Sequence, residues 1–158
     1  ARPLSAASHG LAGELRRRDL WQEISNYAAI YFAAPGVSFV DAHAAIAHAM
    51  AGNDAALQGL RETASGTASD IVNRLADVYH AFAAGNWQAV IDGLLPVMGA
   101  HERLGGSRAQ RDLLEFTLLH ALLRLGKREE ATRLFTLRRP TLAKNGLPPA
   151  LFPKERVA

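Results

Sequence analysis

The chain contains no cysteine, which excludes disulfide bonds, a thiol nucleophile and metal sites with cysteine ligands. It also lacks an apolar run long enough to cross a membrane. Its longest uncharged stretch, residues 24–40, is interrupted by Pro35 and Gly36, whereas a membrane helix needs roughly 20 continuous apolar residues. The N-terminal region has no basic start followed by an apolar run and a cleavage site, so no secretion signal is predicted. We expect no membrane partner, and the cytoplasm is the default compartment.

Apolar residues make up 49% of the 158 residues and charged residues 21%, which is typical of a folded globular domain. The charge is unevenly distributed. Residues 1–100 carry six Lys/Arg against nine Asp/Glu, net −3, and residues 101–158 carry twelve against six, net +6. The basic last third suits an acidic partner. Aromatic side chains are not interleaved among these basic residues, as stacking on single strands requires, so we do not expect nucleic acid as the partner.

Residues 70–82 carry one apolar stripe at helical spacing. From Ile71 onward, large apolar side chains follow at intervals of four, three and four residues, which places them on one face of an α-helix. Gly85 ends this helix, and Asn86 is a suitable N-cap for the next one. The gap is too short for anything but a tight antiparallel hairpin. Trp87 is expected to fill the joint between the two helices.

The same pattern recurs before and after this hairpin, in "HAMAGNDAAL" and in "LLRLGKREEATRLF". The three segments align on Gly52, Gly85 and Gly126, which are 33 and 41 residues apart, a spacing typical of helical repeats. No alternating β-type run competes, so the predicted fold is all-α, with antiparallel hairpins stacked in a right-handed solenoid. The hairpins are expected within a domain of residues 1–140, at about 4–31, 38–65, 68–99 and 107–139.

Residues 141–158 form the expected irregular C-terminal tail. Pro148, Pro149 and Pro153 are incompatible with a regular helix there. The tail is expected to be extended or packed across the last hairpin.

The segment "GGSRAQRD", residues 105–112, allows two interpretations. Two glycines before a helix could bind a phosphate through free backbone N–H groups, with Arg108 and Arg111 assisting. The segment lacks the spacing of known phosphate loops and follows a helix. Ser107 and Gln110 instead have the spacing of a capping box, in which each side chain accepts a bond from the other's backbone N–H.

The histidines do not have the spacing of metal ligands. His43 and His48 are five residues apart, about 140° around a helix, whereas paired ligands on a helix usually lie four apart. We expect no metal and no cofactor. Asp41 and His43 could act together in acid–base catalysis, or Asp41 could simply cap a helix while His43 is partly buried.

"LLRLGKREEATRLF" resembles the turn of a tetratricopeptide (TPR) repeat, with Gly126 at the turn and Ala131 in the close-packed position. "FVDAHAAIAHAMAG" and "GGSRAQRD" resemble segments of the tetratricopeptide repeat protein 38 family, and the likeness covers residues 38–140. This resemblance implies a TPR-like fold. Members of that family are longer, so we expect the chain to be an excised fragment or a shortened relative. The resemblance also implies a polar cluster that contains the following residues: Asp41, His43, Gln110, Arg111 and Asp112.

The leading functional prediction is a non-catalytic module that binds a protein or peptide in a concave groove lined by the first helix of each hairpin. An acidic ligand would suit its arginines, and a homodimer through an exposed end of the array is a variant. The candidate groove residues are Asp41, His43, Arg74, His80, Arg108, Gln110, Arg111, Asp112 and Glu115.

The alternative is an enzyme or ligand-binding protein, acting on a small molecule or assisted by a metal, around Asp41, His43 and the helix start at Ser107. This alternative requires the three side chains to converge in a closed pocket. We expect the module to be non-enzymatic, without the sequence excluding catalysis.

Overall fold

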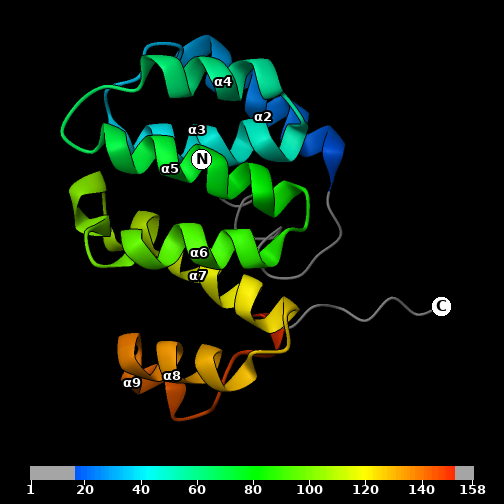
Figure 1. Ribbon diagram of the computed structural model, residues 1–158, viewed down its shortest axis with the longest axis vertical. Helices are drawn as coiled ribbons and strands as arrows, with labels where there is room; N and C mark the ends of the chain where they lie inside the picture. Colours follow the sequence, from blue (N-terminus) through cyan, green and yellow to red (C-terminus); the bar gives the residue numbers. More distant parts are fainter. Residues whose placement is uncertain (1–16, 152–158) are drawn as a thin grey trace.

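The computed structural model describes residues 17–151, and within this range all regular elements are helical (Figure 1). The prediction of an all-α fold is therefore confirmed for these residues. The first part of the expected hairpin 4–31 lies outside them. The elements are α2 (Arg18–Tyr31), α3 (Ser38–Ala51), α4 (Asp54–Thr63), α5 (Ser69–Ala83), α6 (Trp87–Met98), the 3-10 helix η1 (His101–Leu104), α7 (Arg108–Arg124), α8 (Arg128–Arg138), α9 (Pro140–Ala143) and the 3-10 helix η2 (Pro149–Leu151).

Three helix pairs are joined by turns of the same construction. Gly52, Gly85 and Gly126 have φ angles of 76°, 74° and 73°, a left-handed conformation in which only glycine avoids a steric penalty. In each turn, the next residue's N–H bonds the carbonyl five residues earlier, as in a Schellman motif. Asn53 and Asn86 then cap α4 and α6 by accepting bonds from backbone N–H groups. The repeated glycines of the sequence thus mark three equivalent helix reversals.

Small side chains allow α3 to lie close to α5. Alanines dominate the buried part of α3, and Ala76 is fully buried on α5. Side chains of this size let two helix backbones approach closely, and α3 packs against both α2 and α5. The α5–α6 contact is also close, because a Cβ on Gly93 would lie 2.5 Å from Cγ2 of Val78.

Larger side chains fill the space between α5 and α7. Tyr79 is fully buried, with its hydroxyl close to that of Thr117. Phe82 lies 5.4 Å from His120 and 5.3 Å from Trp87, measured between ring centroids. Trp87 thus packs at the joint, as predicted. The helix pairs follow one another along the long axis, from α2–α4 at one end to α8 and α9 at the other (Figure 1).

The chain after α8 is not wholly irregular. Pro140 begins the one-turn helix α9, since the first turn of a helix tolerates the missing N–H of proline. The described part of the tail then returns to the last helix pair, where η2 contacts α7 and Leu151 is buried. No helix among residues 17–151 is long and apolar enough to span a membrane.

Candidate functional site

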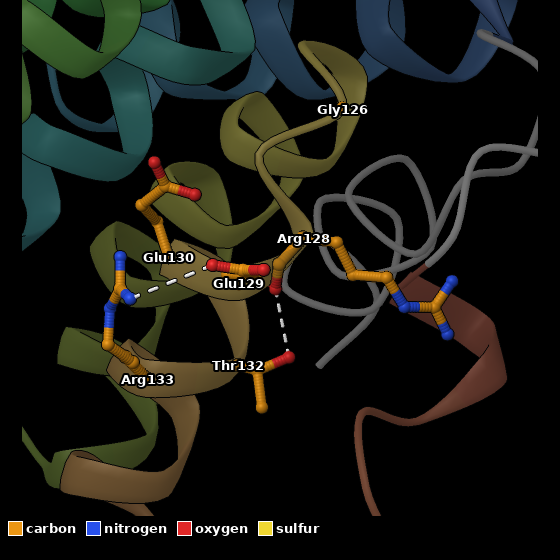
Figure 2. A pocket seen from close by; sticks show the side chains of 6 residues that line it. All are labelled: Gly126, Arg128, Glu129, Glu130, Thr132 and Arg133. Carbon is orange, nitrogen blue, oxygen red and sulfur yellow. Dashed lines mark hydrogen bonds and ion pairs between the residues drawn. The ribbon is translucent and has the colours of Figure 1, made fainter.

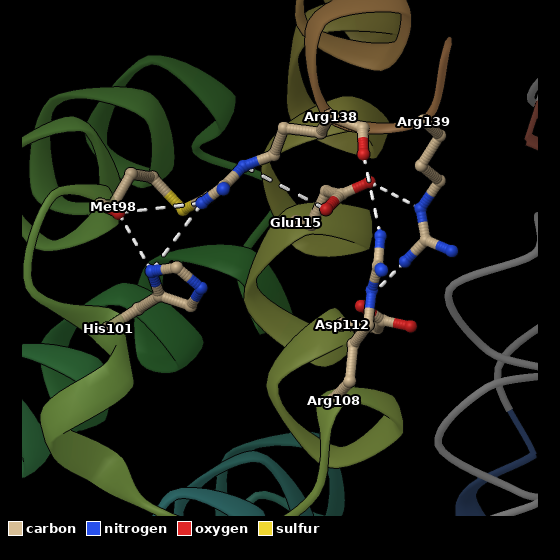
Figure 3. A network of polar contacts seen from close by, with 7 residues as sticks. All are labelled: Met98, His101, Arg108, Asp112, Glu115, Arg138 and Arg139. Atoms are coloured by element: carbon tan, nitrogen blue, oxygen red, sulfur yellow. Dashed lines mark hydrogen bonds and ion pairs between the residues drawn. The ribbon is translucent and has the colours of Figure 1, made fainter. Parts of the chain in front are cut away.

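A polar cavity of about 260 Å³ lies between η1, the first turns of α7 and the end of α8. Figure 3 shows the network of polar contacts around it. We call it the arginine cavity. Its lining residues are His101, Glu102, Arg108, Arg111, Asp112, Glu115 and Arg138. A volume of this size is below the roughly 300–1,000 Å³ of ligand pockets, so it suits one side chain or terminal group rather than a whole ligand.

Arg139 neutralises two carboxylates beside the cavity. Its Nε lies 2.6 Å from Oε1 of Glu115, and its Nη2 lies 2.6 Å from Oδ1 of Asp112. The guanidinium carbon also lies 5.0 Å from the ring centroid of Phe116. Burial opposes the charged form of Arg139, but the bonds to the two carboxylates outweigh this and raise its pKa. Asp112 and Glu115, which come from successive turns of α7, are thereby committed to an internal ion pair.

Arg138 has looser contacts on the other side of the cavity. Its Nη2 is 3.4 Å from the carbonyl oxygen of Met98, and its Nε is 3.8 Å from Oε2 of Glu115. His101 Nδ1 is 2.8 Å from the same Met98 oxygen, so Nδ1 carries the hydrogen and donates it. The 3.5 Å approach of Arg138 Nη2 to this nitrogen is therefore not a hydrogen bond.

Arg108 and Arg111 contact main-chain oxygens. Arg108 Nη2 lies 3.5 Å from the Arg138 carbonyl, and Arg111 Nη1 lies 2.7 Å from the Gly106 carbonyl. The ion pairs of the described residues leave both guanidinium groups without a carboxylate. Three carboxylates line the cavity, those of Glu102, Asp112 and Glu115, and with Arg139 beside it four guanidinium groups lie around them. One further carboxylate or similar anion would balance this charge.

The segment 105–112 is a capped helix start, as the Ser107–Gln110 spacing predicts. Ser107 Oγ accepts from the Gln110 N–H at 3.4 Å, and Gln110 Oε1 accepts from the Ser107 N–H at 2.7 Å. Gly106 has a φ of 73°, and a Cβ there would lie 3.0 Å from Cγ of Phe39. Position 106 is therefore a glycine because a side chain there would be too close to Phe39 on α3.

Asp41 and His43 have separate partners at the start of α3. Asp41 is buried, and its Oδ2 accepts from the Gly36 N–H at 3.0 Å. The interpretation of Asp41 as the N-cap is wrong, because the helix begins at Ser38 and Asp41 lies inside its first turn. His43 Nδ1 is 2.6 Å from the Phe39 carbonyl. Burial raises the pKa of Asp41 and lowers that of His43, which disfavours the charged form of each.

Asp41, His43 and Ser107 thus each bond a different backbone group near the start of a helix. Among residues 17–151, no group of three or more His, Asp or Glu side chains has a geometry that could hold a metal ion.

Arg74 and His80 lie on the exposed face of α5, away from the arginine cavity. His80 Nε2 is 3.9 Å from Oδ1 of Asp54 at the start of α4. Neither Arg74 nor His80 lines the arginine cavity. Four of the nine groove candidates line it: Arg108, Arg111, Asp112 and Glu115.

Sequence reasoning missed three important members of this site, His101, Arg138 and Arg139. The sequence pattern shows Arg138 and Arg139 only as part of the basic charge of residues 101–158. The available signal was their position directly before Pro140, where a helix must end and its last side chains can turn toward a neighbouring helix.

A second hollow, of about 720 Å³, lies at the start of α8 (Figure 2). Arg133 Nη1 is 4.0 Å from Oε2 of Glu129, and Thr132 Oγ1 donates to the Arg128 carbonyl at 2.9 Å. Figure 2 shows the Arg128 side chain extending away from the Arg133–Glu129 pair. These side chains are exposed and do not converge on a common point, so this hollow is a weaker candidate.

No protein-family model matches this chain, and neither does any curated protein or solved structure.

Proposed function

We propose that this chain is a non-catalytic interaction module of TPR-like helix pairs that resembles the tetratricopeptide repeat protein 38 family. In this proposal the pairs form a right-handed solenoid, and the module holds an acidic segment of a partner protein or peptide at the arginine cavity. The three equivalent turns at Gly52, Gly85 and Gly126 support the repeat assignment. They do so because each reverses the chain with the same hydrogen bonds.

The observation that carries the binding proposal is the surplus of guanidinium donors in the arginine cavity. Arg139 already occupies Asp112 and Glu115. Arg108 and Arg111 have only carbonyl partners, and Arg138 has only contacts of 3.4 Å or longer. A peptide carboxylate would add charge-assisted bonds without displacing a strong internal pair.

The test measures binding of a fluorescein-labelled oligo-glutamate peptide by fluorescence anisotropy, with an oligo-glutamine peptide of equal length as the uncharged comparison. We expect the glutamate peptide to bind and the glutamine peptide to bind much more weakly. The double variant Arg108→Gln/Arg111→Gln should weaken glutamate binding about tenfold or more, as expected when charged hydrogen-bonding partners are lost.

A matched variant separates this site from general attraction to a basic protein. Arg74→Gln/Arg133→Gln removes the same charge from exposed positions outside the arginine cavity. We expect it to retain most of the affinity. Equal losses in the two double variants, both shown by circular dichroism to be folded, would refute the assignment of the site.

A further inference from the structure

One ring nitrogen of His101 holds this side chain at the wall of the arginine cavity. Nδ1 donates to the Met98 carbonyl at 2.8 Å, which joins the start of η1 to the end of α6. The ring is half-buried and lines the cavity. Nε2 lies on the side of the ring away from the Met98 contact (Figure 3), and within residues 17–151 it has no hydrogen bond. His101 therefore has one nitrogen left for a ligand.

The protonation state of His101 decides what this second nitrogen can bind. In the neutral ring the single hydrogen is on Nδ1, so Nε2 is an acceptor and cannot bond a carboxylate. Protonation converts Nε2 into a donor and adds a positive charge at the cavity wall. Histidine is the side chain that ordinarily changes its charge between about pH 5 and pH 8. His101 can thus contact an anion directly in only one of its two states.

The cavity brings a ligand's carboxylate close to this ring. The charged side chains that line the cavity with His101 are Glu102 of η1, Arg108, Arg111, Asp112 and Glu115 of α7, and Arg138 of α8. Asp112 and Glu115 are already paired with Arg139. A carboxylate held by the arginines adds a new negative charge beside His101, and an opposite charge within about 4–6 Å favours the protonated form.

The other helices around η1 place no ionisable side chain in the cavity. α3 and α5 contact η1, and α6 precedes it. None of the ionisable residues of these three helices, including Arg74, lines the cavity. The acidic and histidine side chains on these helices have partners elsewhere: Asp41, His43, His48, Asp70, Asp77, His80 and Asp92. His101 is therefore the titrating group of this pH range that faces the ligand.

We propose that His101 is a proton-linked contact of the arginine cavity, whose protonated Nε2 donates to the ligand's acid group, so that acidic segments bind more tightly as the pH falls. This inference rests on the proposed function. Binding and protonation are reciprocal: if the anion favours protonation of His101 by some factor, protonation strengthens anion binding by the same factor. The ordinary pKa of a glutamate carboxyl is about 4.3, so the ligand itself stays charged near pH 6.

The test measures the affinity of the oligo-glutamate peptide at about pH 6 and about pH 8, at one ionic strength. A rhodamine label replaces fluorescein, whose emission changes with pH. We expect the wild type to bind about fivefold more tightly at the lower pH, the lower end of typical coupling between two sites. The carboxylate-free oligo-glutamine peptide should show no such increase.

His101→Asn removes the proposed contact with little other change. The asparagine amide can still donate to the Met98 carbonyl, but it does not titrate and has no counterpart of Nε2. We expect it to lose the pH dependence while its affinity near pH 8 changes by less than about twofold. The matched control is His80→Asn on α5, outside the cavity, which should keep the pH dependence of the wild type.

A nuclear magnetic resonance titration of the His101 ring in the wild type provides a second measurement that needs no variant. Saturating unlabelled peptide should move the midpoint of the ring's titration to higher pH by about 0.7, the equivalent of a fivefold coupling. An unmoved midpoint, or an equal pH dependence in folded His101→Asn and wild type, would overturn this inference and leave the proposed function standing. Absence of glutamate binding at both pH values would refute the proposed function, and this inference with it.

Discussion

Two regions of the molecule, the α3–α5 contact and the junction of α7 with the end of α8, are stabilised by different physical means. At the α3–α5 contact the buried side chains are small and mostly apolar, and the helices lie close together. At the junction of α7 with the end of α8, Arg139 bonds Asp112 and Glu115, and Arg138 reaches Met98. The stability of the α3–α5 contact depends on close packing. The stability of the α7–α8 junction depends on ion pairs, and the candidate binding cavity lies at this junction.

This difference bears on function because charged groups can exchange partners more easily than packed alanines can. Ala131 and Phe135 are the buried residues of α8, and Arg138 at its end contacts Met98 and Glu115. In the function proposed above, a partner's carboxylate exchanges with these polar contacts and leaves the buried residues in place. The α3–α5 contact offers no such exchange.

The largest loss of stability is expected from Leu75→Ala, which removes a buried side chain of α5 from the closely packed region. Leu75 is fully buried on α5. Its truncation should lower the free energy of unfolding by about 2–5 kcal/mol, because it removes apolar burial and leaves a cavity. Urea denaturation gives this difference, which should be the same at low and high salt. Leu137→Ala, on the exposed face of α8, serves as the control and should change stability by less than about 0.5 kcal/mol.

Arg139→Met should destabilise the junction of α7 with the end of α8, which ion pairs hold together. Glu115 is only 6% exposed, so loss of its cation leaves a buried carboxylate unpaired. We expect a loss of about 2–4 kcal/mol in the free energy of unfolding, at the lower end because Arg138 lies near the same carboxylate.

The double variant Arg139→Met/Glu115→Met should recover at least half of that loss, since no buried charge then remains at position 115. Urea denaturation of the wild type, both single variants and the double variant gives the coupling between the two positions. Additive losses would mean that the Arg139–Glu115 pair is not the source of the effect.

A pH titration should distinguish the two regions further. Ser25 Oγ and His48 Nδ1 share a hydrogen bond of 2.8 Å between α2 and α3, and Ser25 Oγ also accepts from Asn53 Nδ2 at 3.3 Å. Burial lowers the pKa of His48 below its usual 6.5. The unfolded chain therefore binds a proton at His48 before the folded chain does. This contribution to stability is complete above pH 6.5 and is lost as the pH falls from 6.5 toward the lower pKa of the folded state.

The His48→Gln variant should accordingly show a shallower fall in stability between about pH 7 and pH 5 than the wild type. Urea midpoints at several pH values in this interval measure the slope. Equal slopes for the two proteins would exclude His48 as a source of the pH dependence.

The sequence predicted local features well. The glycine turns, the cap at Asn86, and the capping box of Ser107 and Gln110 each depend on a few neighbouring residues. Periodicity predicts a helix at residues 70–82, where α5 spans Ser69–Ala83, because an apolar stripe must face a core.

The candidate site could not be predicted in the same way, because its contacts join distant residues. Arg139 meets Glu115 across 24 residues, and Ser25 meets His48 across 23. A list of charged residues does not say which of them will pair across a tertiary junction. The sequence predicts Arg74, His80 and Arg108 in one groove, whereas only Arg108 of the three lines the arginine cavity.

The smallest effect concerns the one turn of the three that lacks a cap. Asn53 and Asn86 each accept a backbone N–H at the start of the second helix of a pair, whereas Lys127 provides no such bond at the start of α8. Lys127→Asn should raise the free energy of unfolding by about 0.5–1 kcal/mol, the usual contribution of an N-cap, because the neighbouring backbone already has the same geometry. Thermal unfolding of Lys127→Asn measures the stability gained from an added N-cap, and thermal unfolding of Asn86→Lys measures the stability lost when an N-cap is removed. If Lys127→Asn gains nothing while Asn86→Lys loses stability, the α8 start is held by its charged neighbours and the three turns are not energetically equivalent.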